Sequence, residues 1–155
     1  MGIEIERKFL VDHAPISEWG DGLVMQQGYL ARGQHAMCRV RVTGERGYLT
    51  IKGQTRGISR QEFEYEIPVE EARSLLKLCE GGVISKTRWC VSVGGKVWEV
   101  DVFDGDNQGL IVAEIELTSE DEEFTKPTWV SEEVSDDPRY FNSALSRHPF
   151  KLWGL

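Results

Sequence analysis

The chain contains 155 residues, of which 28 % are charged and 40 % are hydrophobic, and its formal net charge is −8 at pH 7. This length is ordinary for one domain, so we expect a single domain over residues 1–155. The acidic balance argues against a broad nucleic-acid or membrane surface, since both need clustered Lys and Arg, but it permits a local cationic pocket for a small anion.

Alternation of side-chain character with a period of two residues predicts strands, in chain order, over residues 3–11, 25–33, 36–43, 46–53, 58–67, 83–93, 96–104 and 110–118. Gly94-Gly95, between two of these segments, is typical of a two-residue hairpin. Helical spacing after Pro68 predicts a helix that stops at Gly81-Gly82, and Asp137-Pro138 predicts the start of a short C-terminal helix. No strand is predicted after residue 118.

The cysteines Cys38, Cys79 and Cys90 are odd in number and lack the spacing of metal ligands, which indicates free thiols in a reducing compartment. No apolar run reaches the roughly 20 residues of a membrane-spanning helix. Glu4 and Glu6 stand where a signal peptide would carry basic and then apolar residues. We therefore expect a cytoplasmic protein.

Each charged strand carries its charges on one face, and most of these sets have a single sign. In chain order the sets are Glu4, Glu6 and Lys8; Arg39 and Arg41; Lys52; Arg60, Glu62, Glu64 and Glu66; Lys86 and Arg88; Glu99 and Asp101; Glu114 and Glu116. One interpretation is an antiparallel sandwich or barrel whose charges face solvent. Like charges two residues apart would then repel each other without structural gain, and the opposite apolar faces have little helix to cover them.

A closed eight-stranded antiparallel β-barrel with a charged lumen accounts for both observations, and closure also removes the sheet edges. We therefore predict a mainly β fold of the α+β class, with a few helices packed outside a tunnel. Arg39, Arg41, Lys52, Lys86 and Arg88 would offer the lumen several cations for phosphate oxygens. The acids Glu4, Glu6, Glu64, Glu114 and Glu116 would offer hard oxygen ligands that suit Mg²⁺ or Mn²⁺. Together these groups indicate metal-assisted phosphoryl transfer on a small polyanionic substrate.

The start Glu4-x-Glu6-x-Lys8 resembles the ExExK signature of the CYTH superfamily, the triphosphate tunnel metalloenzymes. The likeness covers nearly the whole chain. It continues through Arg39-Val40-Arg41, Thr50-Ile51-Lys52-Gly53, Glu62-Phe63-Glu64-Tyr65-Glu66, Lys86-Thr87-Arg88, Glu99-Val100-Asp101, Glu114-Ile115-Glu116 and the tail Asp137–Ser143.

The resemblance implies an eight-stranded tunnel that binds a triphosphate and uses a divalent metal. Carried onto this chain, it implies phosphate binding by Lys8, Arg39, Arg41, Lys52, Lys86 and Arg88. It implies metal binding by Glu4, Glu6, Glu64, Glu114 and Glu116, with Glu62 and Asp101 in support. Among these residues we assign Lys8, Glu4 and Glu6 to catalysis. Glu62 could serve only as an ion-pair partner, and we expect Arg60 and Glu99 to be rim or structural charges.

Hydrolysis of inorganic tripolyphosphate is the function we expect, because the chain leaves little material for a base-recognition subdomain. The alternative is a class IV-type adenylate cyclase or a nucleoside or thiamine triphosphatase. A cyclase must hold the ribose hydroxyl against the α-phosphorus and therefore must hold adenine firmly. A non-catalytic polyphosphate-binding module is disfavoured by the acids at positions 4, 6, 114 and 116. The sequence leaves open which residue activates water and whether the chain forms a homodimer.

Overall fold

The computed structural model describes residues 2–154. Its strands are β1 (Ile3–Val11), β2 (Leu23–Arg32), β3 (Ala36–Thr43), β4 (Arg46–Gly53), β5 (Ser59–Ile67), β6 (Glu80–Val93), β7 (Lys96–Phe103), β8 (Ile111–Glu116) and β9 (Val130–Glu133). Its helices are α1 (Val69–Leu76) and α2 (Asn142–Leu145), with 3₁₀ turns η1 (Ile16–Glu18), η2 (Gly105–Asn107), η3 (Pro138–Tyr140) and η4 (Phe150–Leu152). In this part of the chain no helix has the length and apolar character needed to cross a membrane.

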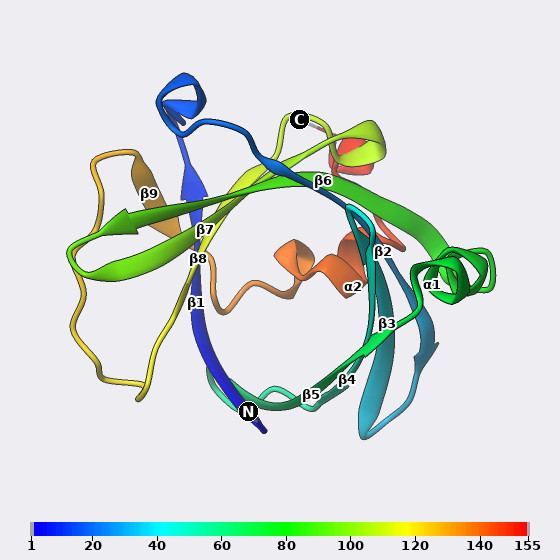
Figure 1. Ribbon diagram of the computed structural model, residues 1–155. Coiled ribbons are helices and arrows are strands. Elements are labelled where there is room, and N and C mark those ends of the chain that lie inside the picture. The colour runs from blue at the N-terminus through cyan, green and yellow to red at the C-terminus, as the bar shows by residue number, and fades with distance from the viewer. Residues whose placement is uncertain (1, 155) are drawn as a thin grey trace.

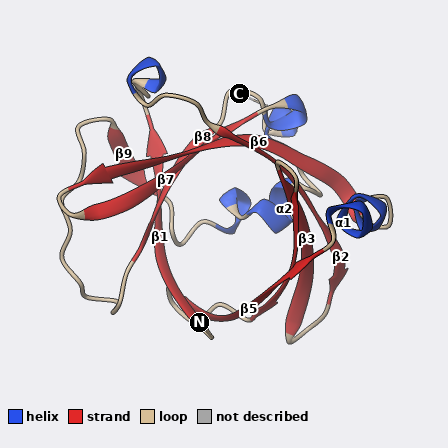
Figure 2. Cartoon of the chain, in the orientation of Figure 1, coloured by secondary structure: helices blue, strands red, loops and turns tan. Residues whose placement is uncertain are grey.

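The strands β1 to β8 close into an antiparallel barrel (Figures 1 and 2). Their order is β5-β4-β3-β2-β6-β7-β8-β1, and β1 pairs with β5 to complete the ring. This closing seam is short, with Glu4 opposite Arg60 at its centre. Farther along β1, the short strand β9 pairs with Phe9 and Val11. The mainly β barrel predicted from the charge pattern is thus confirmed.

Most strand bounds agree with the sequence prediction because tight turns separate the alternating segments. Gly94 and Gly95 have φ angles of 61° and 80°, and they join Val93 to its partner Lys96 across the β6–β7 hairpin. Two successive positive φ angles are what a type I′ turn requires, and Gly adopts them without steric cost.

Two parts of the predicted element pattern were wrong. Helix α1 ends at Leu76 and not at Gly81-Gly82, and both glycines belong to strand β6, which begins at Glu80. Strand β9 lies beyond residue 118, where no strand was predicted. Its four residues Val-Ser-Glu-Glu are too few for a periodic signal, and pairing with the edge of β1 defines it.

The apolar outer face of the barrel is covered more by loops than by helices. Trp98 and Val100 point outward from β7 and have no exposed surface. Around them pack Phe9, Phe124 and Trp129, of which the last two belong to the segment between β8 and β9. On another side, α1 places Ala72 against the outward residues of β3. The apolar faces of β7 and β3 therefore have cover even though the chain contains little helix, whereas Phe63 and Tyr65 on β5 remain 42 % and 58 % exposed.

The expectation that the helices pack outside the tunnel is wrong for the C-terminal helix α2, which does not lie on the outside of the barrel like α1. Figure 1 shows α2 within the ring outlined by the strands. The inner faces of four strands become apolar toward this end, at Leu10, Ile84, Phe103 and Val112, each two residues from a charged lumen position. Leu145, Tyr140, Phe150 and Trp153 pack against them. The C-terminal tail therefore fills one end of the lumen. The spacing of its apolar residues does not indicate the strand face against which they pack.

We predict that Trp98→Ala lowers the free energy of unfolding by about 3–5 kcal/mol, because it removes a large buried ring from the outer cluster. Guanidinium denaturation would measure this loss. The control is Val97→Ala, whose side chain is 53 % exposed on the other face of β7, with an expected change below about 0.5 kcal/mol. Equal losses in both variants would contradict an outer core centred on Trp98.

Candidate active site

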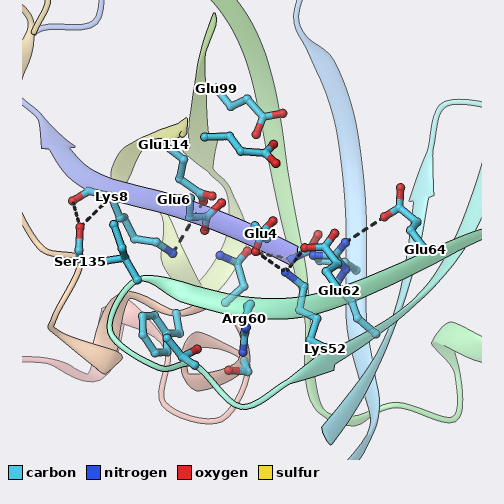
Figure 3. Close-up of a pocket in the computed structure, with 18 of the residues that line it drawn as sticks. Glu4, Glu6, Lys8, Lys52, Arg60, Glu62, Glu64, Glu99, Glu114 and Ser135 are labelled. Carbon is cyan, nitrogen blue, oxygen red and sulfur yellow. Dashed lines mark hydrogen bonds and ion pairs between the residues drawn. The ribbon is translucent and has the colours of Figure 1, made fainter. Parts of the chain in front are cut away.

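The lumen contains a cavity of about 300 Å³ lined almost entirely by polar side chains (Figure 3). The structure brings together nearly every residue predicted for the site. The cavity is lined by Lys8, Arg39, Arg41, Lys52, Lys86, Arg88, Glu4, Glu6, Glu62, Glu64, Glu114 and Glu116. Asp101 is buried beside two of these cations. The inward charged face inferred from strand alternation is therefore correct.

On β1 the two-residue period of the strand places Glu4, Glu6 and Lys8 on the lumen side. The Lys8 side chain is almost fully buried, with its Nζ 3.7 Å from Glu114 Oε1. The same Nζ donates a hydrogen bond of 3.3 Å to the carbonyl of Tyr140. Burial by itself would lower the pKa of Lys8, but Glu114 and Glu6 raise it above its ordinary value. Lys8 is thus a buried, protonated ammonium.

Asp101 holds Lys86 and Arg88 next to each other. It accepts hydrogen bonds of 2.7 Å from Lys86 Nζ, 2.7 Å from Arg88 Nε and 2.9 Å from Arg88 Nη2. Although burial opposes ionisation, these two cations keep the pKa of Asp101 well below its ordinary value. Burial lowers the pKa of Lys86 to about 7; Arg88 and Arg41 add to this effect and Asp101 opposes it. The lysine therefore retains a proton chiefly through Asp101.

Nearer the β1–β5 seam, Lys52 and Arg39 are paired with acids. Lys52 Nζ lies 3.6 Å from Glu4 Oε1 and 3.4 Å from Glu62 Oε2. Arg39 Nη2 lies 3.4 Å from Glu64 Oε2, and Thr50 Oγ1 bridges the same two groups. Glu62 is therefore an ion-pair partner of Lys52 in this structure.

Two pairs of carboxyl groups face each other in the cavity, Glu4 with Glu62 and Glu6 with Glu114. Burial, followed by the hydrogen bond to Glu62, raises the pKa of Glu4 to about 7. Burial and the charge of Glu114 raise the pKa of Glu6 well above its ordinary value. Burial opposes ionisation of Glu114 as well, yet Lys8 and Arg88 lower its pKa to about 2. Each pair therefore shares a proton where a cation could bind instead.

These pairs fit a divalent cation of the Mg²⁺ type. Among residues 2–154, no three His, Cys, Asp or Glu side chains form a ready-made metal cage. Mg²⁺ seldom needs one, since it usually combines one or two carboxylates with substrate phosphate oxygens and water. Paired carboxyl oxygens next to phosphate-binding cations provide that donor set.

Some predicted residues lie toward the mouth of the cavity. Glu116, opposite Glu6 in the β1–β8 register, is exposed, and the Glu64 side chain is 40 % exposed. Arg60 and Glu99, which we expected to be rim or structural charges, both line the cavity. Glu99 accepts a hydrogen bond of 3.1 Å from Arg88 Nη1, in keeping with a supporting charge.

The charge pattern did not indicate the neutral lining residues, among them Gln27, Tyr29 and Asn142. Gln27 is fully buried, and Tyr29 is 3 % exposed. A signal was available for these two, because they alternate with Gly28 on the one barrel strand to which no charged face was assigned. For Asn142 the signal was its place in the tail Asp137–Ser143, which shares the family resemblance but does not reveal that the C-terminal segment packs into the lumen.

The raised pKa of Glu4 predicts a pH-dependent gain in stability for Glu4→Gln in metal-free protein. The folded state favours the protonated carboxyl, so ionisation of Glu4 lowers stability as pH rises from 4.5 to about 7. A glutamine cannot ionise. Its melting temperature relative to wild type should therefore be higher at about pH 8 than at about pH 5.

Calorimetry in EDTA would measure both melting temperatures. Gln61→Ala on neighbouring β5 is the control. Because this side chain is neutral and exposed, its loss should change the melting temperature relative to wild type by the same amount at both pH values. A Glu4→Gln difference that does not grow with pH would contradict the shared-proton description.

Comparison with known proteins identifies the family. Residues 2–141 match the CYTH domain. The chain is 49 % identical over 152 residues to an inorganic triphosphatase of Acetivibrio thermocellus, covering 97 % of each chain. It is 39 % identical over 147 residues to an inorganic triphosphatase of Nitrosomonas europaea, covering 92 % of this chain and 96 % of that one.

A solved structure is also similar. The crystal structure of an inorganic triphosphatase superposes with a TM-score of 0.67 and 36 % identity, covering 92 % of this chain and 96 % of that one. The match to the domain spans most of the sequence, and the relatives align over nearly their full length. The chain therefore belongs to the CYTH domain family.

Proposed function

We propose that this protein hydrolyses inorganic tripolyphosphate in the lumen of its barrel, with Mg²⁺ or Mn²⁺. The observation that carries the proposal is the gathering of seven cationic side chains, Arg60 included, in one cavity of about 300 Å³, next to two carboxyl pairs. A linear polyanion is the ligand that could contact so many cations at once. Two relatives named as inorganic triphosphatases support the same substrate class.

The size and lining of the cavity favour a substrate without a base. Its volume is at the lower end of the roughly 300–1,000 Å³ found for small-molecule sites. Its aromatic lining residues are Tyr29 and Phe141, of which Tyr29 is buried and Phe141 lies below the ammonium of Lys8 at 5.5 Å. Neither side chain is placed as an open stacking platform. A nucleoside or thiamine triphosphate would therefore have to leave its organic part outside.

We infer that Glu4, Glu6 and Glu114 hold the divalent cation, with Glu64, Glu116 and Glu62 nearby. The cation would neutralise phosphate charge and increase the acidity of a water molecule. Arg39, Arg41 and Arg88 would grip phosphate oxygens in two-point contacts, and Lys52 and Lys86 would act as compact charges. Lys8 lies beside the metal-binding acids, so we assign its ammonium to stabilising charge on the transferred phosphoryl group.

Divalent cation removal should abolish phosphate release. Glu6→Ala should reduce turnover of tripolyphosphate by at least about a hundredfold, because it removes a group that organises charge in phosphoryl transfer. Titration with Mn²⁺ in a calorimeter should show weaker metal binding in the same variant. Glu70→Ala on the exposed face of α1 is the control and should match wild type. Full activity in EDTA would refute the metal assignment.

Tripolyphosphate should have a higher kcat/KM than ATP or thiamine triphosphate, because the cavity contacts phosphates and offers no site for a base. Pyrophosphate should be a poor substrate, since it cannot reach all the cationic positions at once. A panel assay of released phosphate and cyclic AMP, with Mg²⁺ and with Mn²⁺, would test this. Faster formation of cyclic AMP from ATP than of phosphate from tripolyphosphate would assign the chain to the cyclases instead.

A further inference from the structure

Gln27 is a neutral side chain buried among the charges of the cavity. It lies on β2 directly opposite Arg41 of β3 and has no exposed surface. Its Oε1 accepts a hydrogen bond of 2.7 Å from Arg41 Nε, and its Nε2 donates one of 2.9 Å to Asn142 Oδ1. Since arginine nitrogens only donate, the amide oxygen must face Arg41. Both the oxygen and the nitrogen of the Gln27 amide therefore have a hydrogen-bond partner.

The orientation of Gln27 is also defined from the side of the C-terminal segment. Asn142 Oδ1 accepts a second hydrogen bond, of 3.0 Å, from Lys86 Nζ. This contact turns the oxygen of the Asn142 amide toward the lumen, where it meets the Nε2 of Gln27. The interactions therefore run from Arg41 through Gln27 and Asn142 to Lys86, across three strands and the tail.

Arg41 differs from the other cations assigned to phosphate binding. Each of the other five has a carboxylate within 4.0 Å: Lys8 has Glu114, Arg39 has Glu64, Lys52 has Glu4 and Glu62, Lys86 has Asp101, and Arg88 has Asp101 and Glu99. Within residues 2–154, Arg41 forms no ion pair, and its hydrogen bond to a side chain is the one to Gln27. Arg60 also lines the cavity, and in the same described part of the chain it has neither an ion pair nor an acceptor of this kind.

The choice of a neutral acceptor has a chemical consequence. A carboxylate opposite Arg41 would cancel the charge that an anion must find there. An amide oxygen supplies one hydrogen bond at Nε, which directs the guanidinium, and leaves the charge and both Nη groups for a phosphate.

We propose that Gln27 is a positioning residue that aims an uncompensated Arg41 at the phosphate chain of the substrate; this rests on the proposed use of tripolyphosphate. Gln27 does not touch the reacting atoms in this role. Loss of its acceptor frees the Arg41 side chain to rotate, so binding weakens while the chemistry of the bound substrate is little changed.

The main test is Gln27→Met, which keeps the length of the side chain and removes both hydrogen bonds. Calorimetric titration with tripolyphosphate in EDTA should give a Kd raised by about tenfold. With the metal restored, KM should rise similarly while kcat stays within about threefold. Gln26→Met is the matched control, because Gln26 is the preceding residue of β2 and is exposed on the opposite face. It should leave Kd, KM and kcat at wild-type values.

A double-mutant cycle shows whether Gln27 acts through Arg41. Once Arg41→Ala has removed the guanidinium, adding Gln27→Met should weaken binding no further. If the two losses instead multiply, or if Gln27→Met binds like wild type, the positioning role is wrong. Should Gln27→Met not fold, Gln27→Glu replaces it: the carboxylate keeps the acceptor but compensates Arg41, so Kd should again rise. An unchanged Kd in Gln27→Glu would overturn the proposal.

The two proposals can fail separately. If wild type binds tripolyphosphate and does not hydrolyse it, the proposed activity is wrong, and the effect of Gln27 on binding still decides its role. If wild type hydrolyses tripolyphosphate and Gln27→Met binds it normally, the activity stands and the positioning role is refuted. If wild type does not bind tripolyphosphate at all, both proposals fall.

Discussion

The barrel depends on charge compensation at Asp101, which is 1 % exposed and accepts hydrogen bonds from both Lys86 and Arg88. Two like charges on alternate positions of β6 would repel strongly in a confined space of low polarity. A carboxylate directly opposite Arg88 on β7 removes most of that repulsion. Desolvating an unpaired ion costs several kcal/mol. Removing one ion of such a cluster therefore lowers the free energy of unfolding by more than the intact cluster contributes to it. The cationic wall exists because this acid lies behind it.

Charges inside the barrel require apolar residues outside, and those residues need cover. Two loop segments supply this cover. The segment before β2 contributes Trp19, and the segment before β9 contributes Phe124 and Trp129. Edge-to-face ring contacts link Trp98 to Phe124 and Trp129. The fold therefore places its main core between barrel and loops, and the lumen remains available for polar groups. Stability and ligand binding are served by opposite faces of the same strands.

The C-terminal tail connects these two faces. Its apolar residues fill one end of the lumen around Ile84 and Phe103, while Asn142 reaches Gln27 and Lys86 at the boundary with the charged region. The lumen is therefore a cavity that the tail bounds at one end. Carboxyl pairs and an uncompensated arginine remain in that cavity, at a cost in stability that the proposed binding of a metal and a polyanion would relieve.

The sequence by itself determined which side chains share a face. Strand pleating has a local period of two, so β1 has the bounds read from the sequence, and Arg39 and Arg41 lie together with no help from distant residues. Most of the charged sets have a single sign, and this indicated that they face a lumen and not solvent. Only the tertiary structure decided the pairing of Glu4 with Glu62, the existence of β9 and the contact between Gln27 and Asn142, which are 115 residues apart. These features depend on closure of the barrel and on where the tail packs, and no local pattern in the chain encodes either.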